Sequence, residues 1–345
     1  MKITEKTVPG YERVVCAVDE AAGYRGIIVV HSTALGPAVG GTRFWRYANQ
    51  NAALTDALRL ARGMTYKNSL AGLPFGGGKA VIMAGDALPD REQIFRAHGR
   101  LIQSLGGQYV TAEDVGTSTG DMEIILRETS YVGGLQNRSG DPSPKTARGV
   151  FRAMQAAAKF RWGSDKLSGK TVAIQGCGHV GYYLGAELHR AGARLIVTDV
   201  EEPRMQRMVD DHAAETVSPA EIYSVRADIF APCALGGVIN DETIPQLQTE
   251  MIVGGANNQL LEPRHGDLLE QRGILYAPDY AANAGGVING CGIEMMGWDE
   301  PRTMAKIDSI YETLLQIFAM ARSEGIPSYQ AADRLAEQRL RKADG

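Results

Sequence analysis

The sequence predicts an α/β protein of two domains, the first built on a mixed sheet and the second on a parallel one. The chain has 345 residues, a length typical of about two domains. Two β-branched runs separated by Gly23 indicate an antiparallel strand pair near the start. After residue 170, short apolar runs alternate with helical stretches, as in a parallel sheet with crossover helices. We expect domains at 1–139 and 140–324, with a helix at 325–345 packing back on the first domain.

Composition excludes several functional classes. The chain is 44% hydrophobic and 22% charged, with a net charge of −4, and it lacks the basic character that nucleic-acid binding requires. No apolar run approaches the ~18 residues of a membrane span, and the N-terminal segment lacks the apolar core of a signal peptide. The four cysteines form no CxxC pair, and no histidine spacing indicates a metal site. We therefore expect a cytoplasmic protein without metal, membrane or nucleic-acid partners.

The hydrophobic periodicity and the positions of glycine, proline and capping residues predict the helices and strands of the first domain. Residues 12–18 and 26–32 are expected to pair, and Gly40-Gly41 marks either a close approach by another group or a plain structural turn. Asn51 is expected to cap a helix that Gly72 and Pro74 end. A second helix is expected at 91–105 and a short strand at 108–111.

Two lysines stand in unusual places. Lys67 lies near the end of the first helix, on the apolar face that carries Leu60, Ala61 and Met64, where a lysine is costly unless it meets an anion. Lys79 follows three glycines and begins a buried apolar run, and desolvation lowers a lysine pKa. The pair suggests that one lysine anchors a substrate carboxylate while the other moves protons. The alternative is a Lys67 that reaches solvent and an ordinary glycine turn before a strand.

Asp114 comes just after the strand at 108–111. Carboxylates beyond the C-terminal edge of a strand lie where α/β sheets place their chemistry. Asp114 could equally cap the helix expected to begin after Thr117. Both alternatives stay open on sequence alone.

A polar stretch rich in Gly and Pro at 136–144 is interpreted as a hinge, followed by a helix at 146–158. A dinucleotide-binding unit comes next: a strand at 170–175, a GxGxxG loop, a helix, and a strand at 194–198 that ends in Asp199. In this Rossmann-type arrangement the helix N-terminus faces the pyrophosphate. Asp199 would accept hydrogen bonds from the ribose hydroxyls and repel a 2′-phosphate, which favours NAD over NADP. The loop residues are Gly176, Cys177, Gly178, His179, Val180 and Gly181.

Further strands are expected at 227–233, 251–253 and 273–276, each ending in small or amide residues that suit a nicotinamide carboxamide or a polar substrate group. Any one of these residues could instead cap a helix. Helical patterns follow at 303–323 and 328–341, long enough to reach the first domain or another subunit.

Taken together, these motifs resemble the amino acid dehydrogenase family that acts on leucine, phenylalanine, valine and glutamate. The resemblance spans nearly the whole chain, and the second half is most similar to leucine-, phenylalanine- and tryptophan-type enzymes. It rests on residues 40–43, 63–68, 76–79, 111–117, 142–146, the GxGxxG unit, 256–259 and 283–289.

The resemblance implies roles for these residues. Lys67 would bind the substrate α-carboxylate with the Gly40-Gly41 backbone, Lys79 would be the general base that activates water, and Asp114 would manage protons on the amino group. Asn257 would orient substrate and nicotinamide. The resemblance also implies closure of two domains over a cleft and a homo-oligomer. Other expected contacts are Val39, Met64, Ala112 and Val287 for substrate, and Thr146, Cys233, Ala234, Leu235, Ala256 and Asn283 for NAD.

The resemblance also bears on the substrate. Glutamate-type members carry a lysine where this chain has Val39, and an unpaired second carboxylate there costs on the order of several kcal/mol. Gly133 and Gly290 replace bulkier residues of leucine-type enzymes, which predicts a pocket for large aliphatic or aromatic side chains unless Cys291, Ile293 or Met295 refills it. The alternatives are a leucine/valine-selective enzyme, a hydroxy-acid or sugar-acid dehydrogenase, and a non-catalytic paralogue that binds nucleotide or amino acid.

Overall fold

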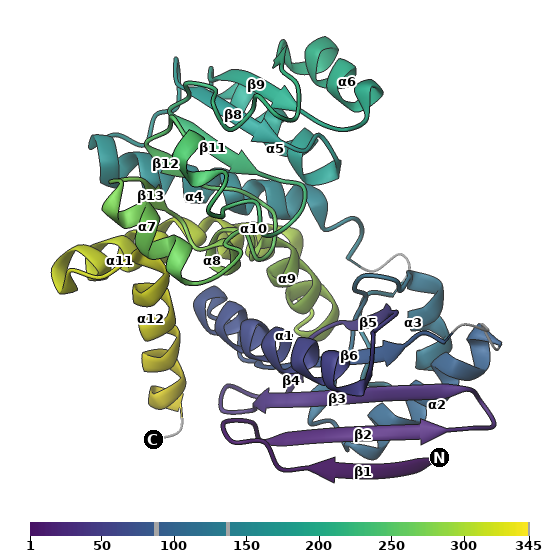
Figure 1. Cartoon of the computed structure of the whole chain (residues 1–345). Coiled ribbons are helices and arrows are strands. Elements are labelled where there is room, and N and C mark those ends of the chain that lie inside the picture. Colours follow the sequence, from purple (N-terminus) through teal and green to yellow (C-terminus); the bar gives the residue numbers. More distant parts are fainter. Residues whose placement is uncertain (86–89, 136–138, 344–345) are drawn as a thin grey trace. The chain divides into compact units, whose positions relative to one another are not determined.

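The computed structural model describes residues 1–85, 90–135 and 139–343, which form two compact units (Figure 1). Unit 1 comprises Met1–Gly140, Gly290–Trp298 and Ala336–Gly345, and unit 2 comprises Asp141–Asn289 and Asp299–Leu335. The predicted fold class is confirmed, since unit 1 carries a mixed sheet and unit 2 a parallel one. Of the stretch interpreted as a hinge, residues 136–138 lie outside the described residues.

The sheet of unit 1 has the order β1-β2-β3-β6-β4-β7, and β5 also pairs with β6. The pairs β1–β2, β2–β3 and β3–β6 are antiparallel, whereas β4 and β5 run parallel to β6. The predicted pairing of 12–18 with 26–32 is confirmed, but β1, β4 and β5 were not foreseen. The strands are β1 Lys2–Lys6, β2 Arg13–Asp19, β3 Tyr24–Ser32, β4 Ala38–Val39, β5 Thr42–Trp45, β6 Gly76–Met83 and β7 Tyr109–Val110.

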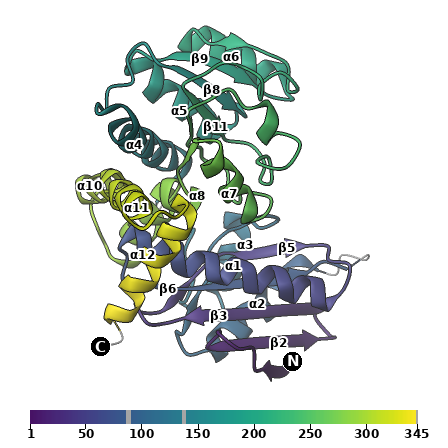
Figure 2. The same ribbon diagram turned by 60° about the vertical axis from the view of Figure 1, so that its left-hand side comes forward.

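Helices cover both faces of this sheet because successive strand side chains point to opposite sides. On one face, Val14 and Cys16 of β2 join the same hydrophobic cluster as the alanines of α1, which lies across β3 and β6 (Figure 2). On the other face, Val15 and Ala17 join the cluster that holds Phe95 of α2. The helices are α1 Gln50–Ala71, α2 Arg91–Ser104 and α3 Thr119–Leu126.

The ends of α1 show one wrong prediction and one confirmed one. The N-cap is Asn49, whose side chain accepts from the Ala52 amide at 2.9 Å; Asn51 already lies inside the helix. Gly72 ends the helix in the left-handed conformation, with φ 61°.

The buried stripe of α1 runs through Ala53, Ala57 and Ala61. Met64 and Lys67 are only half-buried, so Lys67 borders this stripe and does not lie within it as predicted.

Residues near the C-terminus complete unit 1. Helix α12 (Ser328–Ala343) enters this unit at Ala336, whose carbonyl accepts from Ser69 Oγ at 3.0 Å. Arg339 Nη1 donates to the carbonyls of Ser69 and Leu70 at 3.0 and 2.8 Å. These carbonyls belong to the last turn of α1, where backbone donors run out. The Gly72 amide donates to the Ser69 carbonyl at 3.0 Å, and Arg339 adds a side-chain cap.

The sheet of unit 2 is parallel, in the order β10-β9-β8-β11-β12-β13. The order reverses between β8 and β11, the switch point where open α/β sheets bind ligands. Its strands are β8 Thr171–Gln175, β9 Arg194–Thr198, β10 Glu215–Thr216, β11 Ile229–Pro232, β12 Met251–Ile252 and β13 Leu275–Tyr276. Its helices are α4 Ser143–Trp162, α5 His179–Arg190, α6 Glu202–His212, η1 Ile244–Gln246, α7 Arg264–Gln271, α8 Asp279–Ala282, α9 Gly285–Gly290, α10 Glu300–Asp308 and α11 Ile310–Glu324.

The helix predicted at 303–323 is in fact two helices, α10 and α11, that meet at Ser309. Ser309 Oγ donates to the carbonyl of Lys306 at 2.6 Å. A serine that bonds the backbone of the preceding turn offers the chain an alternative to continuing the helix, which explains a break that periodicity does not show.

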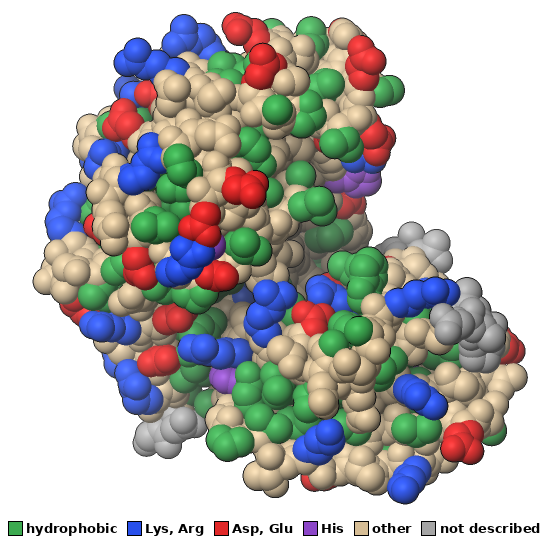
Figure 3. Space-filling view, in the orientation of Figure 1, with side chains coloured by type: hydrophobic (Ala, Val, Ile, Leu, Met, Phe, Trp, Pro, Cys, Tyr) green, Lys and Arg blue, Asp and Glu red, His purple; other side chains and the backbone are tan. Residues whose placement is uncertain are grey.

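Positive and negative side chains are interspersed over the face shown in Figure 3. Within the described part of the chain, no helix is both long and apolar enough to cross a membrane.

Candidate active site

Three backbone segments of unit 1 touch one another through glycines. A Cβ at Gly40 would lie 1.8 Å from the carbonyl oxygen of Gly78, and one at Gly41 would lie 2.4 Å from that of Glu113. No side chain fits in such a gap, so only glycine lets these segments approach. The Gly40 position also lies 3.3 Å from Met64 Cγ, which brings α1 to the same place. The predicted substrate residues Gly40, Gly41 and Met64 are therefore neighbours.

Lys79 and Asp114 form an ion pair at this edge of the sheet. Lys79 Nζ lies 2.8 Å from Asp114 Oδ2, and only 6% of the lysine side chain is exposed. The alternative that Asp114 caps the next helix is wrong, because Ser118 caps α3 and its side chain accepts from the Asp121 amide. The structure thus brings together the two residues to which the sequence assigned proton transfer.

Arg43 was missed as a site residue, although its motif was noted. Its Nε donates to Asp114 Oδ2 at 3.0 Å, the same oxygen that Lys79 contacts, and its Nη1 donates to Asp56 Oδ2 at 2.9 Å. Arg43 is in β5, paired with Val81 of β6, so it shares the sheet face of Lys79. Knowledge of this pairing would have identified it, but a strand of four residues gives little periodic signal.

Burial and charge act in opposite directions at this cluster. Burial lowers the pKa of Lys79 and outweighs the attraction of Asp114, and the positive charge of Arg43 lowers it further. Burial alone would raise the pKa of Asp114, but Lys79 and then Arg43 overcome that effect and hold it below its usual value. The result is a lysine prepared to lose its proton beside a carboxylate that remains ionised.

A network of buried polar side chains is hydrogen-bonded to the Gly40-Gly41 turn. Tyr109 donates to the carbonyl of Gly40. His98 bonds Tyr24 through Nδ1 at 2.7 Å and Thr42 through Nε2 at 2.8 Å. Thr42 in turn bonds Thr111 at 2.7 Å, so the strand ends that carry the turn and the Asp114 loop are tied together.

The remaining predicted substrate residues of unit 1 border this region. Val39 is buried in β4, paired with Gly77, and Ala112 follows β7 and accepts from the Thr42 amide at 2.9 Å. Lys67 is on α1, one turn beyond Met64.

The space predicted at Gly133 is already filled. A Cβ there would lie 3.2 Å from Met295 Cε, whereas one at Gly290 would meet nothing within 4 Å. Met295 belongs to the π-helix η2 (Cys291–Met295), which Glu294 anchors by accepting from the Gly134 amide at 2.8 Å and from Ser139 Oγ. Met295 and Glu294 thus lie against Gly133, while the position beside Gly290 is open; the assignment of both glycines to a substrate pocket stays a prediction.

The glycine loop of unit 2 has the geometry of a phosphate cradle. Gly176 has φ 100° and a Cβ there would lie 2.7 Å from Ala234 Cβ, while one at Gly181 would lie 1.9 Å from the Gly176 carbonyl oxygen. At Gly178, by contrast, the nearest atom would be Arg204 Nη1 at 3.9 Å. Helix α5 has no side-chain cap at its N-terminus, which leaves its first amides available to an anion.

Asp199 stands beside this loop as predicted. Its Oδ2 accepts from the Cys177 amide at 2.7 Å and its Oδ1 from the Glu201 amide at 2.9 Å. His179 and Val180 form the start of α5, and His179 is exposed, 3.5 Å from Asp141.

The other predicted cofactor residues follow the strands next to the switch point. Asn283 Nδ2 donates to Asn257 Oδ1 at 2.7 Å and to the carbonyl of Gly255 at 3.2 Å, so the two amides are held together. Leu235 is 78% exposed. Cys233 and Ala234 follow β11, Ala256 follows β12, Thr146 lies in the first turn of α4, and Val287 lies in α9.

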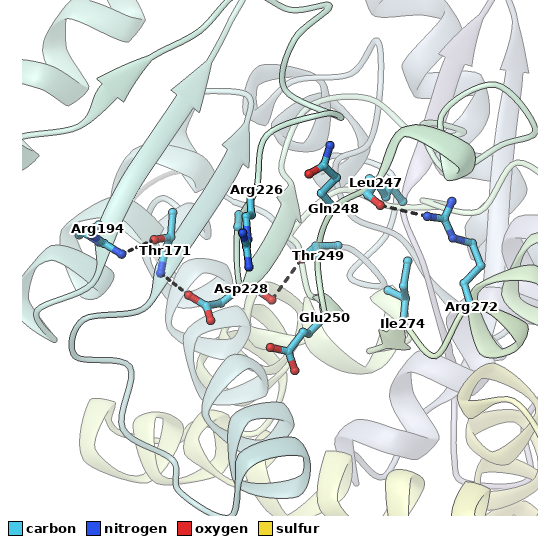
Figure 4. A pocket seen from close by; sticks show the side chains of 11 residues that line it. Thr171, Arg194, Arg226, Asp228, Leu247, Gln248, Thr249, Glu250, Arg272 and Ile274 are labelled. Atoms are coloured by element: carbon cyan, nitrogen blue, oxygen red, sulfur yellow. Dashed lines mark hydrogen bonds between the residues drawn. The ribbon is translucent and has the colours of Figure 1, made fainter.

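A hollow of about 540 Å³ lies at the opposite edge of the parallel sheet (Figure 4). Three of its charged side chains are hydrogen-bonded: Asp228 accepts from Thr171 N at 2.8 Å, Arg272 donates to the carbonyl of Leu247 at 3.1 Å, and Arg194 donates to Thr171 Oγ1 at 3.1 Å. It lies at the N-terminal ends of the strands, away from the glycine loop, and has no part in the predicted site.

Comparisons with known proteins agree with this geometry. Residues 12–131 match the family model "Glu/Leu/Phe/Val dehydrogenase, dimerisation domain", and residues 133–201 and 196–344 match "Glutamate/Leucine/Phenylalanine/Valine dehydrogenase". Leucine dehydrogenase of Geobacillus stearothermophilus is 54% identical over 333 residues, 96% of this chain and 90% of that protein. Valine dehydrogenase of Streptomyces albus is 48% identical over 340 residues, 97% and 93% of the two chains. The crystal structure of L-tryptophan dehydrogenase from Nostoc punctiforme superposes with a TM-score of 0.88 at 44% identity, covering 97% of each chain.

Proposed function

The chain belongs to the Glu/Leu/Phe/Val dehydrogenase family and is an amino acid dehydrogenase, and from this premise we propose which reaction its residues perform. The reaction is the reversible oxidative deamination of an apolar L-amino acid, large aliphatic or aromatic, to the 2-oxo acid, ammonia and NADH. The observation that carries this proposal is the buried Lys79–Asp114 pair, with 2.8 Å between its charged atoms, beside the glycines that let three backbone segments of unit 1 approach one another.

The residues of unit 1 divide the chemistry between them. Lys67 binds the α-carboxylate with help from the Gly40-Gly41 backbone, and Val39 offers an apolar wall rather than a partner for a second carboxylate. A nicotinamide bound to unit 2 would supply the hydride acceptor for Cα, and the residues of unit 1 then act on the iminium carbon. Lys79, as the neutral amine, takes a proton from the water that adds to this carbon.

Collapse of the resulting carbinolamine requires a proton on the amino group and loss of one from the new hydroxyl. Asp114 passes the proton that Lys79 took from water to the departing ammonia, and Lys79, neutral again, accepts the proton of the hydroxyl. The lowered pKa of Lys79 suits this role, because a base works best when its pKa lies near the working pH.

NAD is the cofactor that the residues of unit 2 fit. The open space at Gly178 and the uncapped start of α5 suit a pyrophosphate. The Asp199 carboxylate is placed to accept from ribose hydroxyls and disfavours the 2′-phosphate of NADP. We assign Asn257 to substrate and nicotinamide, and Thr146 and Asn283 to the nicotinamide side.

The side-chain pocket supports a broad apolar substrate class. Met295 narrows it over Gly133, but its thioether chain is flexible and adapts to different shapes. The free space at Gly290 leaves room for a ring. The names of the relatives span leucine, valine and tryptophan. A leucine- or valine-selective enzyme remains the second candidate, favoured by Met295 alone.

We further propose that residues 1–139 bind substrate and form the subunit contacts of a homo-oligomer, that residues 140–324 bind NAD, and that the two domains close over the reactants. The four cysteines are free thiols, which suits a cytoplasmic location. Small-angle scattering of the apo and ternary states would test closure; identical curves would contradict it.

The deciding experiment is NADH formation with leucine, valine, phenylalanine, tryptophan and glutamate, run in parallel with NADP. We expect turnover with the apolar amino acids, none above background with glutamate, and a preference for NAD. Turnover with none of them would refute the catalytic proposal and favour a non-catalytic binding protein.

A further inference from the structure

Two cations converge on a single carboxylate oxygen in unit 1. Lys79 Nζ and Arg43 Nε lie 2.8 and 3.0 Å from Asp114 Oδ2. Both contacts are to Oδ2 rather than to the second carboxylate oxygen, Oδ1. If Lys79 is the base, it must lose its proton during the cycle, and a buried Asp114 would then face a neutral amine. Without another cation, burial would favour protonation of Asp114 at that moment.

We propose that Arg43 is a positioning residue that keeps Asp114 ionised and fixed beside Lys79 while Lys79 gives up its proton. The inference rests on the proposed function, because it assigns Arg43 a part in the proton transfers of that reaction. A guanidinium suits the task, since it stays charged at all working pH values and its planar fork reaches two carboxylates at once.

The rest of the cluster holds Arg43 in place. Its Nη1 donates to Asp56 of α1, and Asp56 also accepts from Tyr47 at 2.8 Å. Arg43 and Asp56 side chains are 20% and 18% exposed, so their interaction is only partly screened by water. The side chain therefore has one orientation, with its Nε toward Asp114.

The charged groups that act on Lys79 come from three elements: Asp114 from the loop after β7, Arg43 from β5 and Asp56 from α1. Tyr109 packs against Gly78, on the opposite face of β6, and burial raises its pKa. Helix α1 also carries Lys67. Arg43 and Asp56 act on Lys79 in opposite directions, since Arg43 favours its neutral form and Asp56 its charged form.

These opposite effects give the test its discriminating power. The pH dependence of kcat for deamination is measured in the wild type, in Arg43→Gln and in Asp56→Asn. We expect the midpoint of the rising limb to move up by about one pH unit in Arg43→Gln, so that the rate well below it falls about tenfold. In Asp56→Asn the midpoint should move down.

Two further variants separate charge from shape. Arg43→Lys retains the positive charge, and its midpoint should return to that of the wild type even if kcat is lower. Arg59→Gln is the matched control: Arg59 lies 3.5 Å from Asp56 on its outer side and is 63% exposed, so its removal should leave the midpoint unchanged.

A purely structural Arg43 would lower thermal stability and kcat equally at every pH and leave the midpoints of both variants in place, which would overturn the inference. If Arg43→Gln does not fold, the downward shift in Asp56→Asn and the wild-type midpoint of Arg43→Lys still decide it. A midpoint in Asp56→Asn that stays or rises contradicts the proposal.

A readout without turnover separates this inference from the proposed function. Acetylation of Lys79 by acetic anhydride is followed against pH by peptide mass spectrometry, with the exposed Lys166 as internal reference. If the wild type deaminates amino acids but Arg43→Gln changes neither midpoint nor labelling, only the role of Arg43 is wrong. If the wild type turns over no amino acid, the proposed function fails, and labelling alone tests Arg43.

Discussion

Substitution of Gly290 by valine tests the substrate pocket. Gly290 has helical backbone angles, φ −60° and ψ −53°, and a Cβ there meets nothing within 4 Å. The fold should therefore accept the change, with the free energy of unfolding altered by less than about 1 kcal/mol. If this space receives the substrate side chain, two added methyl groups will occupy it.

The magnitude follows from that volume. A leucine substrate gains up to about 1.6 kcal/mol of binding free energy, at about 0.8 kcal/mol for each methylene-sized group that it newly contacts. The ring of a phenylalanine substrate would be overpacked against the valine, at a cost of about 1 to 3 kcal/mol in binding free energy. The ratio of kcat/KM for phenylalanine over leucine should thus fall by at least about fivefold, since the smallest expected difference, about 1 kcal/mol, is a factor of about five.

The assay is the initial rate of NADH formation with each amino acid, at saturating NAD. Gly63→Val is the matched control: Gly63 lies exposed in α1 and its Cβ position is also open. A ratio in Gly290→Val within about twofold of the wild type, in a protein of normal stability, would refute the assignment of Gly290 to the pocket.

Other substitutions test the base, the cofactor site and the buried network. Lys79→Ala should lower kcat by about 10²- to 10⁴-fold while calorimetry shows unchanged NAD binding; near-normal turnover would mean that another group is the base. Asp199→Ala should weaken NAD at least about tenfold and NADP far less, because the carboxylate discriminates between them; an unchanged preference in titrations would exclude that role. Burial lowers the pKa of His98 from 6.5 to about 3, so the unfolded chain binds one more proton than the folded one between these values. The free energy of unfolding should fall by about 1.4 kcal/mol for each pH unit below 6.5. In His98→Gln, urea denaturation at pH 7, 6 and 5 should show a pH dependence that corresponds to about one proton fewer.

Local sequence patterns predicted much of the fold and of the site. The antiparallel pair, the strand–GxGxxG–helix unit and the capping glycine at 72 depend on residues close together in the chain. The glycines at 76–78 and the adjacent Lys79 were recognisable for the same reason, because a run of small residues before a charged one has few structural explanations.

Features that depend on contacts between distant segments were not predictable from local patterns. Arg43 reaches Asp114 only through the register of β5 on β6. Met295 fills the space at Gly133 because Glu294, 160 residues from Gly134, binds the amide of that residue. The two-residue strand β4 is too short for an alternating pattern, so it forms because its neighbours offer hydrogen bonds.

The capping of α1 by α12 has a consequence for synthesis of the chain. The Ser69 and Leu70 carbonyls receive their Arg339 partner only after residue 339 has left the ribosome. At about 5 to 20 residues per second, the delay after residue 140 is on the order of 10 to 40 s. During that interval the growing polypeptide carries an unfinished unit 1 whose α1 C-terminus is open to water and to chaperones, while unit 2 is still being translated. Arg339 is thus among the last residues whose arrival completes the fold of the first unit.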